Sequence, residues 1–262
     1  MILILRTIKW LLHLMLFSNL NIFKTLKLNF SQYPAIDALK FPILIFGSVE
    51  LKILGDIEFE IIRFGVLKLG YRGSELELGC TSDVGQMQID KGGKIKINGT
   101  SGFVWLTPGY KIFVRSNRTL NLDTSIYIGP NSRLVCSDSI TIKEGFSSGW
   151  NLQILDSDAH YSVNTVTLEI QNNKLPIHLN EKVWCGNNVT LMKGCKIGEG
   201  SIVASKSLVN RDFCNDCNVI LAGTPARIVK QNFTRFWFGE DYLNNYFYLN
   251  PDRKINSTDI RH

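Results

Sequence analysis

The sequence predicts an all-β chain wound as a parallel β-helix, because apolar and small residues return at every sixth position over long stretches. In "CGNNVTLMKGCKIGEGSIVASKSLVNRD", residues 185 to 212, one series falls at step six and a second lies four positions after it. An amphipathic helix repeats near 3.6 residues and a half-buried strand near 2, so this period indicates short strands separated by regular corners. Hexapeptide repeats are typical of parallel β-helices.

The repeat extends over two blocks of the chain. The in-phase positions are Ile128, Leu134, Ile140, Phe146 and Leu152 in the first block, and Leu179, Cys185, Leu191, Ile197, Val203 and Val209 in the second. The companion series is Val189, Cys195, Ser201, Ser207 and Phe213. These positions favour the solenoid over an ordinary β-sandwich, and the 21 glycines suit its many tight corners.

Composition limits the class of partner. The 262 residues are 45% hydrophobic, enough to bury a sizeable core, and 29 basic against 23 acidic residues give a net charge of +6. A basic balance favours anionic partners. The sequence has no zinc finger, no aromatic RNA-binding block and no run of five basic residues, so we expect no nucleic-acid partner.

The cysteines indicate a reducing compartment. They are Cys80, Cys136, Cys185, Cys195, Cys214 and Cys217, spread along the chain without a dense framework. Such spacing is typical of reduced, buried thiols in a cytoplasmic protein. Cys214 and Cys217 form one CxxC pair, but a structural zinc site would need a second pair, so we expect no metal.

The N-terminal stretch "MILILRTIKWLLHLMLFSNLNIFKTLKLNF" favours an amphipathic helix. No small-residue cleavage site follows its apolar region, and Lys9, His13 and Ser18 interrupt it, so neither a signal peptide nor a membrane span is expected. Such a helix either lies on an anionic membrane surface or packs on the protein body. The protein is then cytoplasmic, and in the first case peripheral at the inner membrane face.

The chain divides into three parts. We expect residues 1–45 to form the amphipathic helix and a connector, residues 46–223 the β-helix, and residues 224–262 a C-terminal turn, helix and aromatic tail. The 27 residues between Leu152 and Leu179 are not a multiple of six, so a loop must leave the β-helix there, around 157–178. Long loops on rigid scaffolds tend to carry function.

Two stretches carry a resemblance to a known family. "VWCGNNVTLMKGCKIGEGSIVASKSLV" followed by "AGTPARIVK" resembles the hexapeptide-repeat acyltransferases, which include the xenobiotic, maltose and galactoside acetyltransferases. "SSGWNLQILDSDAHYS" looks more narrowly like bacterial surface-polysaccharide O-acetyltransferases. The resemblance covers residues 126 to 230 and implies a left-handed β-helix, a homotrimer, acetyl-CoA bound between adjacent subunits, and a catalytic histidine where the loop begins.

By position that histidine is His160. Moving an acetyl group from a thioester to a sugar hydroxyl requires a base, and a neutral imidazole with a reference pKa of ~6.5 suits that task at neutral pH. The alternative is His178, just before the second block, because the other two histidines lie near the chain ends. Asp158 either orients the imidazole of His160 or is a solvated loop carboxylate.

Two residues near the loop have other expected roles. Trp150 either forms a wall of the acceptor site or packs on the body. Asp156 is in phase with the preceding repeat, which favours a role in a corner.

The resemblance also implies a donor site. It places Trp184 beside the pantetheine arm and the backbone N–H of Asn187 at the thioester carbonyl, where it would stabilise developing oxyanion charge. The other implied contacts are Ala204 and Ser205 for the pantetheine amides, Thr224 and Pro225 in the following turn, and Arg211, Arg227 and Lys230 for the CoA phosphates. Thr224 replaces the family's usual asparagine, and the three cations could equally be solvated surface residues.

These observations predict an acetyl-CoA-dependent O-acetyltransferase that acts directly on a sugar hydroxyl of a bacterial surface polysaccharide or its precursor. One alternative is a sugar-nucleotide N-acetyltransferase, which would use the same base and groove. Another is a non-catalytic trimeric β-helix that serves as a scaffold or binds glycans. A carbonic anhydrase would need three histidine ligands for zinc, and the repeat region has only two histidines.

Overall fold

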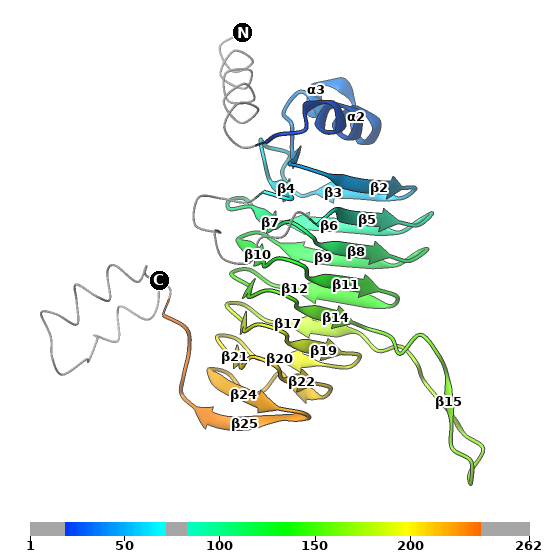
Figure 1. The fold of residues 1–262 in the computed structure, drawn as a ribbon, viewed down its shortest axis with the longest axis vertical. Coiled ribbons are helices and arrows are strands. Elements are labelled where there is room, and N and C mark those ends of the chain that lie inside the picture. The colour runs from blue at the N-terminus through cyan, green and yellow to red at the C-terminus, as the bar shows by residue number, and fades with distance from the viewer. Residues whose placement is uncertain (1–18, 72–82, 237–262) are drawn as a thin grey trace, which may run out of the picture.

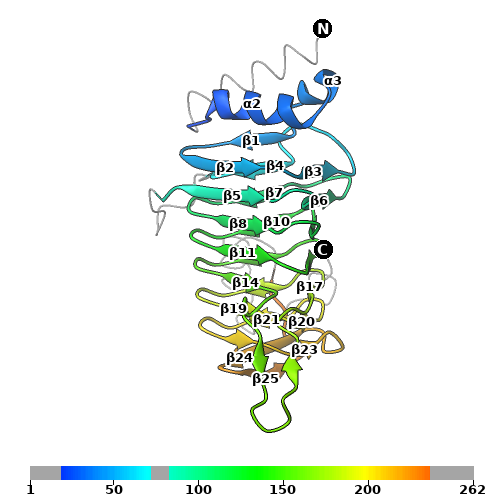
Figure 2. The ribbon, with the colours of Figure 1, turned by 90° about the vertical axis from the view of Figure 1, so that its right-hand side faces the viewer.

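The computed structural model describes residues 19–71 and 83–236, which form a column of stacked coils (Figure 1). Each coil contributes one strand to each of three sheets, so the column has three faces (Figure 2). Nearly all strand pairs are parallel, and among the described residues only two pairs of named strands are antiparallel. The predicted all-β, parallel architecture is confirmed.

The three faces are named here sheets 1, 2 and 3. Sheet 1 consists of β1 (Ile43–Ile45), β4 (Leu67–Leu69), β7 (Val104–Leu106), β10 (Ile126–Ile128), β13 (Ser147–Ser148), β18 (Trp184–Cys185), β21 (Ile202–Val203), β24 (Val219–Gly223) and β25 (Ala226–Gln231). Sheet 2 consists of β2 (Val49–Ile53), β5 (Gly85–Ile89), β8 (Lys111–Val114), β11 (Arg133–Cys136), β14 (Gln153–Leu155), β19 (Thr190–Met192) and β22 (Leu208–Val209). Sheet 3 consists of β3 (Asp56–Phe59), β6 (Lys94–Asn98), β9 (Thr119–Asp123), β12 (Ser139–Ile142), β17 (Ile177–Leu179), β20 (Lys196–Ile197) and β23 (Asp212–Phe213).

The hexapeptide positions form the core of the column. Every in-phase position of both blocks, from Ile128 to Val209, is 0% exposed. Burying one such aliphatic side chain stabilises the fold by about 1.5–3 kcal/mol. The two serines of the companion series are buried as well, and their hydroxyls accept backbone N–H groups of the next coil: Ser201 from Val219 at 3.3 Å and Ser207 from Gly223 at 3.2 Å. The period of six is therefore the period of inward-facing side chains.

Helix α2 (Ile22–Gln32) closes the N-terminal end of the column. The first coil has no preceding strand, and side chains of α2 bond to its backbone instead. The amide of Asn29 donates to the carbonyl of Ile43 at 2.8 Å and its Oδ1 accepts the N–H of Ile43 at 3.2 Å. The hydroxyl of Thr25 accepts the N–H of Ile45 at 3.1 Å. Because buried backbone groups must be paired, α2 takes the place of a missing strand.

The predicted membrane contact concerns the other face of this region. Residues 1–18, which hold most of the predicted amphipathic helix, lie outside the described residues. On α2, Phe23 and Phe30 point outward and are 82% and 46% exposed. The short helix α3 (Ala35–Ala38) then leads into β1. Within residues 19–71 and 83–236 no helix is long and apolar enough to cross a bilayer.

The C-terminal end of the column is closed by a hairpin, and here the prediction of a helix is wrong for residues 226–231. β24 and β25 pair antiparallel through a tight turn that joins Gly223 to Ala226. Without β25, β24 would present an unpaired edge, and Ala226 and Ile228 alternate inward as a strand requires. The rest of the predicted helix and tail falls largely on residues 237–262, outside the described residues.

The predicted loop is a hairpin that projects from the column (Figure 1). It is closed at its base by a bridge between Ser157 and Lys174, and its arms pair antiparallel as β15 (Ser162–Val163) and β16 (Ile170–Gln171). The loop ends earlier than predicted, because β17 begins at Ile177 and includes position 178. Residues 158–172 are exposed throughout.

Candidate active site

Most of the predicted donor residues meet at the corner between sheets 1 and 2. This corner, called here corner A, consists of residues 149–151, 186–188 and 204–206 from three successive coils, and of the β24–β25 turn, residues 222–225, at the same edge of sheet 1. The segments are joined by backbone hydrogen bonds: the N–H of Asn188 donates to the carbonyl of Trp150, and that of Lys206 to the carbonyl of Asn187, both at 2.9 Å. Corner A therefore stacks residues that lie far apart in the sequence.

Glycine begins two of these segments because the next coil packs directly against it. A Cβ on Gly149 would lie 1.8 Å from Oδ1 of Asn187, and a Cβ on Gly186 would lie 2.6 Å from Oγ of Ser205. Both distances are too short for any side chain. The glycines therefore allow Asn187 and Ser205 to lie against the preceding coil.

Side-chain hydrogen bonds link the segments of corner A in a chain. The N–H of Trp150 donates to Oδ1 of Asn187 at 3.2 Å, and the N–H of Asn187 donates to Oγ of Ser205 at 3.1 Å. One coil further, the hydroxyl of Thr224 donates to the carbonyl of Lys206 at 3.4 Å. The predicted acceptor-site and donor-site residues are thus neighbours at one corner.

One detail of the predicted donor site is not supported. The backbone N–H of Asn187 was expected to face a thioester carbonyl, but Oγ of Ser205 already accepts it. Ser205 is exposed, and a hydroxyl that accepts one hydrogen bond can still donate its own hydrogen. The group at this position that can meet an incoming carbonyl is therefore the hydroxyl of Ser205. The N–H of Ala204 is also occupied, by the carbonyl of Leu221 at 2.8 Å.

Trp184 lies on sheet 1 just before corner A and is half-buried beneath a cation. The guanidinium of Arg235 lies over its ring, 5.3 Å from the ring centroid, and donates a hydrogen bond to Oγ of Ser147. Burial lowers the pKa of Arg235 from its usual value. The sequence pattern missed Arg235 because the aromatic C-terminal stretch has no repeat that would place it on sheet 1.

His160 and Asp158 lie at a different corner, between sheets 2 and 3, called here corner B. The ammonium of Lys193, in the turn after β19, contacts the carboxylate of Asp158 at 2.5 Å and donates to the carbonyl of Asn172 at 2.6 Å. The backbone N–H of His160 donates to the carbonyl of Asp158 at 2.8 Å, and its imidazole is exposed. Asp158 is therefore paired with Lys193, and the expected bond to the imidazole is not present among the described contacts.

Asp156 has the corner role that was predicted. Its side chain is 0% exposed and accepts the N–H groups of Ser137 at 2.7 Å and Asp138 at 2.8 Å, in the coil before it. Burial raises the pKa of Asp156 above its usual value, although these two hydrogen bonds oppose the shift. A buried carboxylate that pairs two corner N–H groups belongs to the scaffold.

The alternative base, His178, lies on sheet 3 with its Nε2 2.9 Å from Oδ1 of Asn180.

The three predicted phosphate contacts do not lie together. Arg211 is at corner B, immediately before β23, whereas Arg227 and Lys230 are on β25. Lys230 lies over the ring of Phe233, 4.9 Å from its centroid. Arg227 lies beside Ala222 at the end of corner A, whereas Lys230 pairs with Ile220 at the other end of β24.

One chain therefore does not bring the predicted base and the predicted donor site together. Asn151 at corner A and Asp156 at corner B are five positions apart, separated by strand β14, and this is about 16 Å at ~3.3 Å per residue. The hairpin that carries His160 projects away from the column instead of folding back over corner A (Figure 1). Among the described residues no group of three or more His, Cys, Asp or Glu side chains is arranged to hold a metal ion.

The fold and corner A define a β-helix protein of the hexapeptide-repeat type, and comparisons with known proteins identify its relatives. The chain is 42% identical over 57 residues to 2,3,4,5-tetrahydropyridine-2,6-dicarboxylate N-acetyltransferase of Clostridium perfringens, covering 22% of this chain and 23% of that protein. It is 24% identical over 146 residues to galactoside O-acetyltransferase of Escherichia coli, covering 53% of this chain and 66% of that protein. These relatives confirm the resemblance to hexapeptide-repeat acetyltransferases.

A solved structure of a hexapeptide-repeat-containing acetyltransferase from Vibrio cholerae, complexed with acetyl-CoA, matches with 25% sequence identity and a TM-score of 0.37, covering 47% of this chain and 70% of that one. No protein-family model matches the chain. The chain spans about a quarter of the length of the first of these relatives, and about two thirds of the second.

Proposed function

We propose that the protein is an acetyl-CoA-dependent O-acetyltransferase of the left-handed β-helix class, which transfers an acetyl group to a sugar hydroxyl of a bacterial surface polysaccharide or its precursor. The observation that carries the proposal is corner A, where Trp150, Asn187 and Ser205 meet from three successive coils, with Trp184 just before it on sheet 1. The similarity to galactoside O-acetyltransferase of Escherichia coli supports an oxygen acceptor.

In this proposal the donor lies along corner A. Trp184 contacts the pantetheine arm after Arg235 moves from its ring, and Arg227 and Lys230 bind the CoA phosphates. The hydroxyl of Ser205 donates to the thioester carbonyl. Because this hydroxyl also accepts the N–H of Asn187, it is polarised toward donation, and it would stabilise the oxyanion that develops during attack.

His160 is the proposed base. Its imidazole takes the proton of the acceptor hydroxyl as the sugar oxygen forms a bond to the thioester carbon. The carbon–sulfur bond then breaks, and the imidazolium returns the proton to the departing thiolate of CoA. No protein nucleophile is needed, because the acetyl group moves in one direct transfer.

The separation of the two corners means that a neighbouring subunit completes the site. We propose a homotrimer in which the hairpin of one subunit presents His160 to corner A of the next. Within one chain the projecting hairpin and the solvent-facing Ser205 lie at different corners. In the proposed trimer they would meet across the interface between two subunits. A closed ring of head-to-tail contacts places one such shared site at each interface.

The first experiment is calorimetric titration of acetyl-CoA into the wild type and into Trp184→Ala, with the oligomer mass measured on the same samples. Saturable binding to a trimer, weakened in the variant, is expected, and acetylated products from sugar and amino-sugar acceptors would then separate O- from N-transfer. An absence of acetyl-CoA binding would instead favour the non-catalytic scaffold or glycan-binding protein.

A mixing experiment tests the shared site. His160→Ala and Trp184→Ala are each expected to be inactive as homotrimers. Co-expressed, they should regain up to about a quarter of wild-type activity, because that fraction of randomly formed interfaces joins an intact hairpin to an intact corner A. If both residues acted within one chain, the mixed trimers would stay inactive.

We retain a peripheral membrane contact at the cytoplasmic face as part of the proposal. Exposed Phe23 and Phe30 on α2 support it, beside Lys27 on the same helix. Deleting residues 1–24 should move the protein from liposome pellets to the supernatant while acetyl-CoA binding is kept. Unchanged pelleting would remove this part of the proposal.

A further inference from the structure

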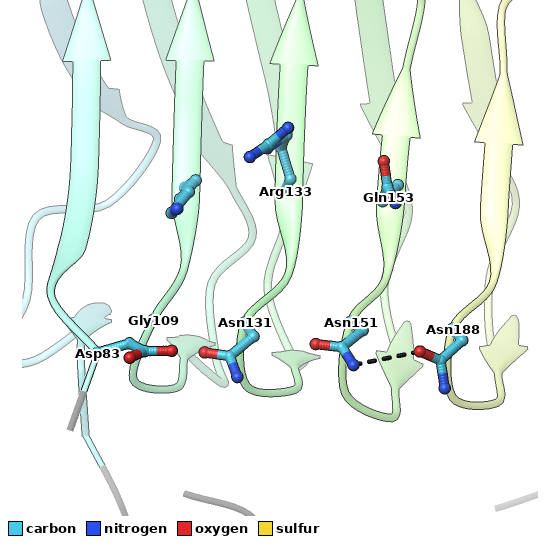
Figure 3. A pocket seen from close by; sticks show the side chains of 8 residues that line it. Asp83, Gly109, Asn131, Arg133, Asn151, Gln153 and Asn188 are labelled. Carbon is cyan, nitrogen blue, oxygen red and sulfur yellow. Dashed lines mark hydrogen bonds between the residues drawn. The ribbon is translucent and has the colours of Figure 1, made fainter. Parts of the chain in front are cut away.

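A polar groove runs along the outer face of sheet 2, beside corner A (Figure 3). It has a volume of about 440 Å³ and crosses β5, β8, β11, β14 and β19 at their N-terminal ends. Its lining residues are Asp83, Gly109, Lys111, Asn131, Arg133, Asn151, Gln153 and Asn188. Figure 3 shows Asn131, Asn151 and Asn188 in one row at the corner, with Arg133 and Gln153 on the adjoining strands.

Two cations lie side by side in this groove. Arg133 and Lys111 are direct partners on neighbouring strands, and among the described residues neither forms an ion pair with a carboxylate within 4.0 Å. Like charges directly opposite each other destabilise a sheet. The fold therefore keeps an arrangement that an anion bound between the two strands would relieve.

Sheet 3 shows the opposite arrangement. There Lys94 pairs with Glu58 at 2.5 Å, Lys143 with Asp123 at 3.4 Å, and Lys196 with Asp212 at 2.7 Å. The cations named on sheet 3 thus have carboxylate partners, whereas Lys111 and Arg133 on sheet 2 have none within 4.0 Å among the described residues. The one carboxylate that lines the groove, Asp83, lies at its far end next to Gly109.

We propose that this groove binds a carboxylate-bearing glycan chain that extends parallel to the long axis of the β-helix. Lys111 and Arg133 would pair with sugar carboxylates, and the side-chain amides of Asn151, Gln153 and Asn188 would bind hydroxyls, because an amide both donates and accepts hydrogen bonds. Neighbouring strands lie about 4.8 Å apart, so the five strands span about 19 Å, enough for a short oligosaccharide.

The groove is continuous with the proposed catalytic corner. Asn151 and Asn188 line the groove and directly follow Trp150 and Asn187 in the chain, and Nδ2 of Asn151 donates to Oδ1 of Asn188 at 3.1 Å. One end of a glycan bound in the groove would therefore lie at corner A, beside Trp150 and Asn187. That this glycan is the acceptor rests on the proposed function, whereas its binding does not.

A sugar polymer fits the lining better than a nucleic acid does. None of the eight lining residues is aromatic, so no platform is present on which a base could stack. The lining instead has a row of amides at the corner, from Asn131, Asn151 and Asn188, beside Lys111, Arg133 and Gln153 on the strands.

The test uses direct binding of oligogalacturonates of two to eight sugars to the full-length oligomer, measured by calorimetry. The matched probe is the same oligomer with its carboxylates methyl-esterified, and inorganic polyphosphate of similar length serves as a polyanion without sugars. The test variant is Lys111→Gln with Arg133→Gln. The control variant, Lys94→Gln with Lys196→Gln, removes the same charge from sheet 3.

The proposal expects affinity for oligogalacturonate to rise with length up to about the span of the groove and to fall about tenfold or more in the groove variant, through loss of two charge-assisted hydrogen bonds. The control variant should bind as the wild type does, and the methyl ester and polyphosphate should bind more weakly than the acid oligomer. Equal losses in both variants, or equal binding of polyphosphate, would overturn the proposal. Acetyl-CoA titration of the same samples reports separately on the proposed function, since glycan binding needs no donor.

Discussion

The carboxylate of Asp158 and the ammonium of Lys193 lie 2.5 Å apart and join the base of the projecting hairpin to corner B. Lys193 also donates to the carbonyl of Asn172 on the other arm of the hairpin. One side chain thus contacts both arms of the hairpin where they leave the column. In the proposed trimer this contact sets the direction in which His160 is presented to the next subunit.

Replacing Lys193 with Met should release this anchor. Because a partly exposed ion pair contributes about 1 kcal/mol or less, the free energy of unfolding should change little. Turnover should fall more than stability, with faster hydrogen exchange in residues 157–175. If exchange and turnover both match the wild type, Lys193 does not position the hairpin.

Replacing His160 with Ala should lower the rate of acetyl transfer by ~10²–10⁴-fold, the usual contribution of a general base. Acetyl-CoA affinity should stay similar, because the proposed donor site is at corner A. His178→Gln is the matched control, since His178 bonds to Asn180 on sheet 3 and should be dispensable. Near-normal turnover in His160→Ala, or a large loss in His178→Gln, would reverse the assignment.

Ser205→Ala should lower kcat by ~10²–10³-fold, as expected when one donor to a developing oxyanion is removed. KM for acetyl-CoA should change little, because Trp184, Arg227 and Lys230 remain. Ser205→Thr keeps the hydroxyl and should recover most of the rate. Equal kcat values for Ser205→Ala and the wild type would indicate that a backbone N–H, and not this hydroxyl, stabilises the oxyanion.

Asp156 predicts a pH dependence of stability. Burial raises its pKa in the folded state, so between the ordinary pKa of an aspartate and the raised value the folded state binds more protons than the unfolded state. The contribution of Asp156 to the free energy of unfolding is therefore present at acid pH and falls as pH rises through the raised pKa.

Asp156→Asn isolates this contribution, because every other titrating group is common to both proteins. In urea unfolding from pH 4 to pH 8, the stability of the wild type relative to the variant should decline as pH rises. Asparagine loses one acceptor for the N–H groups of Ser137 and Asp138, which adds a pH-independent cost of about 1–3 kcal/mol. Parallel curves would show that the carboxylate does not titrate as stated.

Cys185 should be chemically inert. It is 0% exposed, and burial raises the pKa of its thiol well above the usual value, so the reactive thiolate is absent at neutral pH. Iodoacetamide should modify exposed Cys217 and leave Cys185 unmodified in the native protein. Cys185→Val should keep its turnover, and a folded but inactive variant would indicate an acyl-cysteine intermediate.

The sequence could predict the column itself because its signal is local and repeated. Inward positions such as Leu191 and Val203 lie in similar buried environments in successive coils, so the six-residue period can be read directly from the sequence. The role of Asp156 followed from the same phase. Corner A could also be predicted from the sequence, since Trp150, Asn187 and Ser205 occupy equivalent positions in successive coils.

What could not be predicted depends on contacts between distant segments. The strand Ala226–Gln231 forms because β24 would otherwise have a free edge. Its conformation therefore depends on the neighbouring strand and not on its own sequence. Arg235 covers Trp184 from 51 positions later in the chain, and Lys193 finds Asp158 only once the hairpin has a direction. The N–H of Asn187 was misjudged because its partner, Ser205, comes from the next coil.

The two closed ends of the column have a consequence for assembly. A stack of parallel strands can in principle add further copies end to end and grow into a fibre, because each terminal edge is a template for another strand. Here side chains of α2 occupy the first edge of sheet 1 and the antiparallel strand β25 occupies the last. Growth along the axis is thereby blocked at this sheet, which is compatible with the flank-to-flank contacts of the proposed trimer.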